Sequence, residues 1–124
     1  TPHDGEFARL AGAPPAADRL GSVRDLAAGT GAVVLLKGPL TVVADPAGQV
    51  ALSATGGAPL ATAGTGDVLT GIVAAFCAMG VAPLEAAAVG AFVHGLAGRA
   101  GPAMGLVAGD VVDLVPRVLS ELVG

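Results

Sequence analysis

Hydrophobic positions in the first half of the chain fall into short runs that predict strands. Residues 32–37 (AVVLLK) form a continuous apolar run, which is typical of a strand buried on both faces. Residues 40–44 (LTVVA) and 49–53 (QVALS) predict two further strands. The intervening residues 45–48 (DPAG) have the composition of a tight turn. The pattern therefore predicts one buried strand followed by a β-hairpin with an exposed face.

Elsewhere, apolar residues recur at helical spacing. A short helix is expected within residues 1–10, with Asp4 as its cap and Glu6 favouring its N-terminal dipole. Longer helices are expected over residues 14–28, 65–79, 84–99 and 110–123. Pro116 should kink the last helix or start a new turn. The expected core of the two central helices comprises Val68, Leu69, Ile72, Val73, Phe76, Met79, Ala88, Phe92 and Leu96.

Composition supports an α/β domain of closely packed elements. The 124 residues suffice for one domain with a modest core. Apolar residues make up 53% of the chain and charged residues 13%, and much of the apolar share is Ala and Val. Residues 68–84 carry no charge but fall short of the roughly 20 residues of a membrane span. They also contain Gly80 and Pro83, which predict two buried helices and no membrane segment.

The charged residues and the cysteine narrow the function classes. The net charge is −4, and the six basic residues are scattered singly. Without a basic patch or an aromatic platform, nucleic-acid binding is not expected. The single cysteine, Cys77, cannot form an intrachain disulfide, which fits a reducing compartment such as the cytoplasm. Cys77 has no metal-ligand spacing around it, so we expect a small buried thiol.

A glycine-rich loop precedes the expected helix at residue 65, in the stretch 60–71 (LATAGTGDVLTG). Glycines let phosphate oxygens reach backbone N–H groups, and the helix N-terminus adds unpaired donors and a positive dipole end. The nearby carboxylate of Asp67 would repel a phosphate unless it accepts a proton from an attacking hydroxyl. Asp67 could equally cap the helix. The local sequence leaves both roles open.

Three other polar residues each allow a functional and a structural interpretation. Lys37 ends a buried strand and precedes Gly38, a position suited to neutralising phosphate, or it simply reaches solvent. His3 and Glu6 could contact substrate or form a capped helix start. His94 lies on an apolar helix, where a buried, hydrogen-bonded histidine is favoured over a catalytic one.

Taken in order, several stretches resemble one family over essentially the whole chain. They are TPHDGEFARL (1–10), LLKGPLTVVAD (35–45), ATGGAPLATAGTGDVLTG (54–71), HGLAGR (94–99) and AGDVVDLVPRVLSEL (108–122). Together they resemble the C-terminal half of the NAD(P)H-hydrate dehydratases, ADP- or ATP-dependent repair enzymes of the ribokinase-like superfamily. The resemblance implies a three-layer αβα fold. Residues 1–124 would form the C-terminal portion of one such domain.

The resemblance also implies a role for particular residues. Asp67 would lie by the substrate and act as the catalytic base, and His3 would help bind the hydrated nicotinamide substrate. The nucleotide would contact Lys37, Gly38, Pro39, Leu40, Thr41, Gly64, Thr65 and Gly66. The implied reaction is attack of the hydrate's C6 hydroxyl on the terminal phosphate of ADP or ATP, with Mg²⁺, followed by loss of phosphate to restore NADH or NADPH. None of the chain's residues is implied as a metal ligand.

Some positions depart from the family pattern. Asp4 stands where Pro is usual, Gly57 where Asn is usual, and Arg99 where Asp is frequent. The chain is also about half a complete family domain, so an uncovered sheet edge and self-association into a homo-oligomer are expected. Two alternatives remain: a kinase of the same fold acting on a sugar or vitamin alcohol, and a nucleotide-binding remnant without catalysis.

Overall fold

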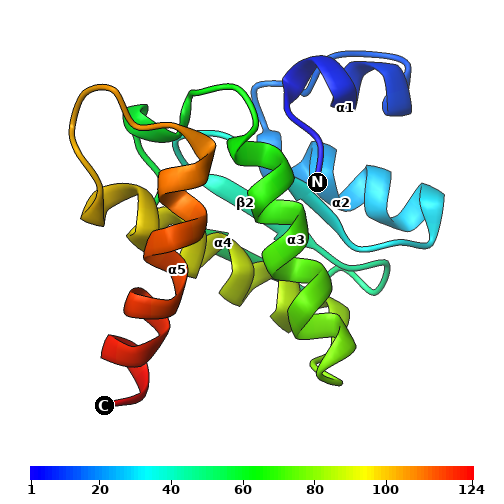
Figure 1. Ribbon diagram of the computed structural model, residues 1–124. Coiled ribbons are helices and arrows are strands. Elements are labelled where there is room, and N and C mark those ends of the chain that lie inside the picture. The colour runs from blue at the N-terminus through cyan, green and yellow to red at the C-terminus, as the bar shows by residue number, and fades with distance from the viewer.

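A three-stranded antiparallel sheet forms the middle layer of the computed structural model, which describes residues 1–124 (Figure 1). Its strands are β1 (Val34–Leu36), β2 (Thr41–Ala44) and β3 (Val50–Ser53), with β2 in the centre. One face is covered by α1 (Asp4–Ala11) and α2 (Arg19–Thr30) and the other by α3 (Thr65–Ala78) and α4 (Pro83–Ala100). A 3₁₀ turn, η1 (Ala58–Leu60), precedes α3, and α5 (Ala108–Val123) packs on α4 and α3. The predicted three-layer α/β fold is confirmed.

Alternating side chains of β1 and β2 enter two separate hydrophobic cores. Val34 and Leu36, with Val42 and Ala44 of β2, pack against α1 and α2. Their sequence neighbours, Leu35 and Val43, pack on the other face against Leu69 of α3 and residues of α4. Since successive strand residues point to opposite faces, a continuous apolar run is what a doubly covered strand requires. Leu52 of β3 is 55% exposed, as expected for a hairpin with one open face.

The hairpin turn follows the predicted chemistry. Gly48 has a φ of +87°, a conformation that side chains rarely adopt. The Asp45 carboxylate accepts a hydrogen bond of 2.8 Å from the Gln49 N–H, and the Asp45 N–H donates to the Gln49 carbonyl. This turn sets the register in which Val43 faces Ala51.

The first two helices begin at residues other than those expected. His3, not Asp4, caps α1: its Nδ1 accepts from the N–H groups of Gly5 and Glu6, at 3.0 and 3.2 Å, and Glu6 accepts from the His3 N–H at 2.8 Å. The prediction of Asp4 as the cap was therefore wrong, and its carboxylate pairs with Arg19 instead. Helix α2 starts only at Arg19 because the Asp18 carboxylate caps it through the Gly21 N–H.

The boundaries of α3 and α4 agree closely with prediction, but parts of their expected core were assigned wrongly. Phe92 is 40% exposed, since α4 packs through a stripe of small residues on its other face. Along this stripe Gly90 faces Val73 and Gly98 faces Leu60. Small residues let neighbouring backbones approach closely, and larger side chains are turned outward.

The end of α3 extends past its packing partners. Met79 is 76% exposed and Cys77 is also exposed, so the expectations of a core methionine and a buried thiol were wrong. Only Thr65 and Leu69 of this helix are fully buried, both near its start. The most deeply buried part of the helix is thus its N-terminal end.

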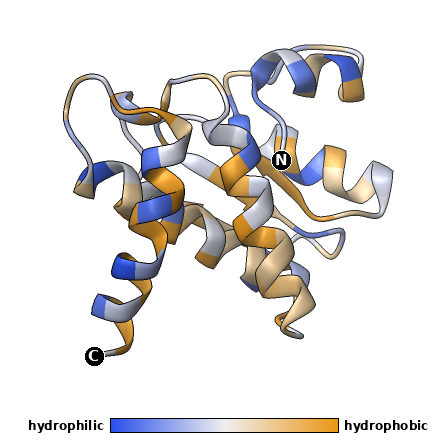
Figure 2. Cartoon of the chain, in the orientation of Figure 1, coloured by the Kyte–Doolittle hydropathy of each residue, from blue (hydrophilic) through white to orange (hydrophobic).

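Helix α5 runs without interruption through Pro116, so no new helix starts there. Its apolar face, with Val111 and Val118 buried, packs against Val93, Ala97 and Leu106. The opposite face is hydrophilic (Figure 2). None of the helices combines the length and apolar character that crossing a membrane would require.

Candidate active site at the start of helix α3

A cavity of about 800 Å³ lies where the start of α1, the end of β1, the loop after β3 and the first turn of α3 meet. Nine of the ten site residues expected from the sequence line it. They are His3, Lys37, Gly38, Pro39, Thr41, Gly64, Thr65, Gly66 and Asp67. Leu40 does not line the cavity, and its side chain is 45% exposed. Segments far apart in the sequence are therefore gathered at one end of the sheet.

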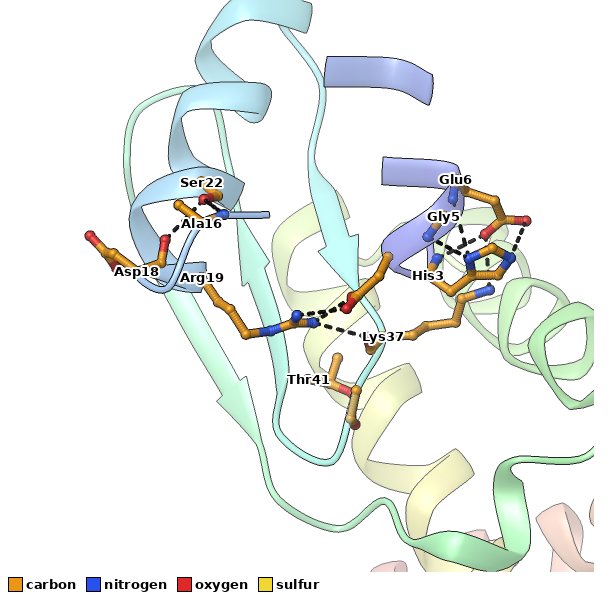
Figure 3. A network of polar contacts seen from close by, with 11 residues as sticks. His3, Gly5, Glu6, Ala16, Asp18, Arg19, Ser22, Lys37 and Thr41 are labelled. Carbon is orange, nitrogen blue, oxygen red and sulfur yellow. Dashed lines mark hydrogen bonds and ion pairs between the residues drawn. The ribbon is translucent and has the colours of Figure 1, made fainter. Parts of the chain in front are cut away.

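The N-terminal segment is held against the end of β1. The Lys37 N–H donates a hydrogen bond of 2.9 Å to the Pro2 carbonyl, which continues the sheet edge by one contact. The Lys37 ammonium lies 3.4 Å from the Glu6 carboxylate, and the His3 ring lies beside both (Figure 3). The His3 N–H, and to a smaller extent the Lys37 charge, hold the pKa of Glu6 below its ordinary value. This arrangement places the only lysine of the chain beside the capped start of α1.

The glycine-rich loop takes the geometry expected of an anion-binding helix start. Gly64 has a φ of +87° and is the residue immediately before α3. The buried hydroxyl of Thr65 donates to carbonyls of the loop, at 2.6 Å from Leu60 and 2.8 Å from Thr62, and so closes the loop on itself. The N–H groups of Thr65 and Asp67 donate to the carbonyls of Thr62 and Gly64, at 3.3 and 3.1 Å, whereas the Gly66 N–H has no hydrogen-bond partner. The Gly66 N–H therefore remains available to an anion in the cavity.

Lys37 adds a second positive group to this helix start. A Cβ atom at position 66 would lie 3.0 Å from the Lys37 ammonium, so Gly66 leaves the room that this side chain occupies. An ammonium beside the positive end of a helix dipole is unfavourable in isolation. An anionic ligand that contacted both groups would remove that repulsion.

The Asp67 carboxylate does not cap α3. The cap position belongs to Gly64, and no side chain makes a capping hydrogen bond there. Asp67 lies in the first turn of the helix, is exposed and lines the cavity. The alternative that Asp67 caps the helix is therefore wrong. Its carboxylate lies at the space that a ligand would occupy.

His94 is buried and hydrogen-bonded, as expected, and it also reaches the cavity. Its Nε2 lies 2.8 Å from the Thr65 carbonyl. A carbonyl oxygen only accepts hydrogen bonds, so this nitrogen donates. Burial, assisted by the Lys37 charge, lowers the pKa of His94, although the bond to Thr65 acts in the opposite direction. A neutral imidazole thus holds the start of α3 through the Thr65 carbonyl.

Several lining residues were not predicted as site residues from the sequence. Thr1 and Thr70, which both line the cavity, share a hydrogen bond of 2.9 Å between their hydroxyls. Gly56 and Gly57 also line the cavity. Arg99, outside the cavity, donates to the Ala54 carbonyl at 2.7 Å and so steadies the start of this loop. The glycine pair was a visible signal, whereas the threonine pair depends on a contact between distant segments.

Comparisons with known proteins agree with this geometry. The family model described as NAD(P)H-hydrate dehydratase matches residues 1–116. The chain is 51% identical over 98% of its length to the bifunctional NAD(P)H-hydrate repair enzyme Nnr of Mycobacterium leprae, of which it covers 26%. It is 47% identical over 90% of its length to the ADP-dependent (S)-NAD(P)H-hydrate dehydratase of Neisseria meningitidis, of which it covers 40%.

Solved structures give the same result. The ADP/ATP-dependent NAD(P)H-hydrate dehydratase of Bacillus subtilis, co-crystallised with ATP and Mg²⁺, superposes with a TM-score of 0.90 at 34% identity. The match covers 97% of this chain and 46% of that one. The chain therefore spans less than half of these relatives.

Proposed function

Because this chain belongs to the NAD(P)H-hydrate dehydratase family, we propose that its cavity is the nucleotide-binding and catalytic part of an ADP- or ATP-dependent dehydratase acting on hydrated NADH or NADPH. The observation that carries the proposal is the meeting of Asp67, Lys37 and the glycine start of α3 in one cavity. A base and a cluster of anion-binding groups are what phosphoryl transfer to a hydroxyl requires.

In the proposed reaction, the glycine loop and Lys37 hold the phosphates of the nucleotide. Asp67 accepts the proton of the substrate's C6 hydroxyl as the oxygen attacks the terminal phosphorus. The bond between that phosphorus and the nucleotide oxygen breaks, and the nucleotide departs with the bonding electrons. Phosphate then leaves C6 with the electrons of the C–O bond, and the adjacent ring carbon loses a proton, so that the double bond of the reduced nicotinamide is restored. Backbone donors and Lys37 offset the charge that develops on the phosphoryl oxygens.

The donor groups of the cavity fit a Mg²⁺ ion that is carried mainly by phosphate oxygens. The lining includes two carboxylates, Glu6 and Asp67, and the chain contains no cluster of three or more residues placed to hold a metal ion. Mg²⁺ commonly binds through one or two carboxylates together with substrate phosphates. Bound in this way, it would neutralise phosphate charge.

The experiment that tests the proposal is turnover of hydrated NADH and NADPH by the full-length protein, with ADP and ATP supplied separately. Recovery of the absorbance of the reduced nicotinamide is expected with at least one nucleotide. A parallel assay offers the protein sugars and vitamin alcohols, the substrates of the alternative kinase. Phosphorylation of such an alcohol without turnover of either hydrate would replace our proposal. Binding of ADP without any turnover would favour the non-catalytic alternative.

Three expectations about the molecule's context stay predictions. Self-association is supported by the unpaired edge of β3 and by exposed apolar side chains beside it, among them Leu52 and Phe92. Light scattering on the full-length protein measures the mass directly, and a monomer would contradict self-association.

A cytoplasmic location rests on the single unpaired cysteine. The description of residues 1–124 as the C-terminal portion of one domain also stays a prediction.

A further inference from the structure

Two ion pairs connect the N-terminal segment to the residues around the end of β1. The first, between Glu6 and Lys37, lies inside the cavity. The second joins Asp4 to Arg19, and neither of its residues lines the cavity. Arg19 donates from Nη2 to one carboxylate oxygen of Asp4 at 2.8 Å and from Nη1 to the other at 3.0 Å. The pair is therefore bidentate, the geometry in which Arg–carboxylate contacts are strongest.

Arg19 makes a third contact, to the main chain of the expected nucleotide loop. Its Nη2 lies 3.3 Å from the Lys37 carbonyl oxygen. A Cβ at position 38 would lie 3.2 Å from the same nitrogen, so Gly38 leaves space for the guanidinium (Figure 3 shows Arg19 directed at this segment). The Arg19 guanidinium thus connects Asp4, which follows His3, to Lys37, which precedes Gly38.

The backbone of Arg19 is held in place by helix α2. Arg19 is the first residue of α2, whose start is capped by Asp18, and α2 is anchored in the core by buried Val23 and Leu26. The Arg19 side chain is about one-third exposed. Because Arg19 is attached to a packed helix and its guanidinium is planar, it restricts where the N-terminal segment and the Lys37 loop can lie.

We propose, on the basis of the proposed function, that Arg19 is a positioning residue that fixes His3 and the Lys37–Thr41 loop relative to each other. Its side chain does not line the cavity, so in this proposal it acts without contacting the substrate or the nucleotide. Through Asp4 it orients the His3 side of the cavity, and through the Lys37 carbonyl it orients the nucleotide side. Lysine cannot replace it, because an ammonium has no planar fork to satisfy both carboxylate oxygens while reaching the carbonyl.

The proposal predicts a pattern across three variants of the full-length protein. Arg19→Gln removes the charge and the fork, and the KM for nucleotide and the KM for hydrate should each rise about fivefold or more, with a smaller change in kcat. Asp4→Asn leaves the contact to the Lys37 carbonyl, so the KM for hydrate should rise more than the KM for nucleotide. Arg19→Lys should restore less than half of what Arg19→Gln loses.

A matched control separates positioning from stability. Arg117→Gln removes another arginine–carboxylate pair, formed with Glu121 at 2.9 Å on α5, away from the cavity. Both KM values should be unchanged in it. Urea unfolding of each variant identifies conditions under which every protein is folded, and kinetics are compared only there. The double variant Asp4→Asn/Arg19→Gln should be no worse than Arg19→Gln, because Asp4 acts only through its contact with Arg19.

The outcomes that overturn the proposal are distinct from failure of the function. If the unchanged protein turns over hydrate and folded Arg19→Gln has the same two KM values, Arg19 does not position the site. If Arg19→Lys is fully active, the planar fork is not required and the proposal fails. If the unchanged protein shows no turnover, the proposed function fails, yet calorimetry with ADP still tests Arg19. Equal ADP affinity in Arg19→Gln and the unchanged protein would then overturn the proposal.

Discussion

The ammonium of Lys37 lies against Gly66, so close that a Cβ at position 66 would come within 3.0 Å of its nitrogen. The contact joins the end of a strand to the first turn of a helix, across the cavity of the candidate site. Position 66 must therefore be glycine to leave room for the Lys37 side chain. Gly66 has no positive φ, so another residue could adopt its backbone conformation.

Gly66→Ala should therefore fold but bind nucleotide more weakly. The added methyl group displaces the flexible end of Lys37 and fills space next to the first N–H groups of α3. We expect about a tenfold loss in affinity for ADP, the effect of about 1.4 kcal/mol, measured by calorimetry. Gly71→Ala is the control, because nothing lies within 4 Å of a Cβ there. Equal ADP affinities in the two variants would show that Lys37 does not share the site with the nucleotide.

Asp67→Asn should separate binding from chemistry. The amide keeps the size of the side chain but cannot accept the substrate's proton, so turnover of hydrate should fall by about 10²–10⁴-fold, the usual contribution of general base catalysis. Affinity for ADP should change little, or improve as a negative charge is lost near the phosphates. Asp113→Asn, on an exposed position of α5, serves as the control. Undiminished turnover by Asp67→Asn would remove Asp67 from the proposed mechanism.

Stability should fall on acidification because of His94. Burial holds the pKa of this imidazole below its ordinary value of 6.5, so the unfolded chain binds a proton at a higher pH than the native protein. The free energy of unfolding should decrease as the pH falls below 6.5, by at most about 1.4 kcal/mol per unit, and level off below the native pKa.

Urea unfolding between pH 5 and pH 8 measures this dependence. His94→Gln keeps a donor for the Thr65 carbonyl but cannot be protonated in this range. Its unfolding free energy should therefore vary less over the same interval. Identical pH profiles for both proteins would mean that another group produces the acid sensitivity.

Two glycines should respond in opposite ways to alanine. A Cβ at Gly95 would lie within 2.6 Å of the carbonyl carbon of Thr55, which is main chain and cannot move aside easily. Gly95→Ala should therefore destabilise the protein by about 1–3 kcal/mol. Gly71→Ala, in open space on a helix, should stabilise it by up to about 1 kcal/mol. Thermal or urea unfolding decides the matter, and equal effects would contradict the close approach of α4 and the loop at Thr55.

Sequence patterns predicted the elements and most of the site for identifiable reasons. The apolar run before Lys37 and the turn at residues 45–48 depend on local rules of burial and turn geometry, and both predictions were confirmed. The glycine loop, Lys37 and His3 were found because their residue types matched a recognisable pattern. Nine of the ten site residues predicted from the sequence line one cavity, although their individual roles stay predictions.

What could not be predicted depends on contacts between distant segments. Met79 and Phe92 have the right spacing for a core, but α4 packs through small residues and turns Phe92 outward. Asp4 has the right chemistry for a cap, but Arg19, fifteen positions further along, engages its carboxylate and leaves the cap to His3. Local propensity cannot anticipate which of two eligible neighbours a remote partner will bind.

The hydrogen bonds at the start of α1 have a consequence for His3. Its Nδ1 accepts from the N–H groups of Gly5 and Glu6, so the lone pair of that nitrogen is already engaged. In the neutral ring the hydrogen must then reside on Nε2. Nε2 is accordingly a donor that lies 3.6 Å from a carboxylate oxygen of Glu6, and we expect a carbonyl or carboxamide oxygen of a ligand to suit it. To serve as a base it would have to take the proton on Nδ1 and uncap its own helix, which is consistent with the proposal that Asp67, and not His3, accepts the substrate's proton.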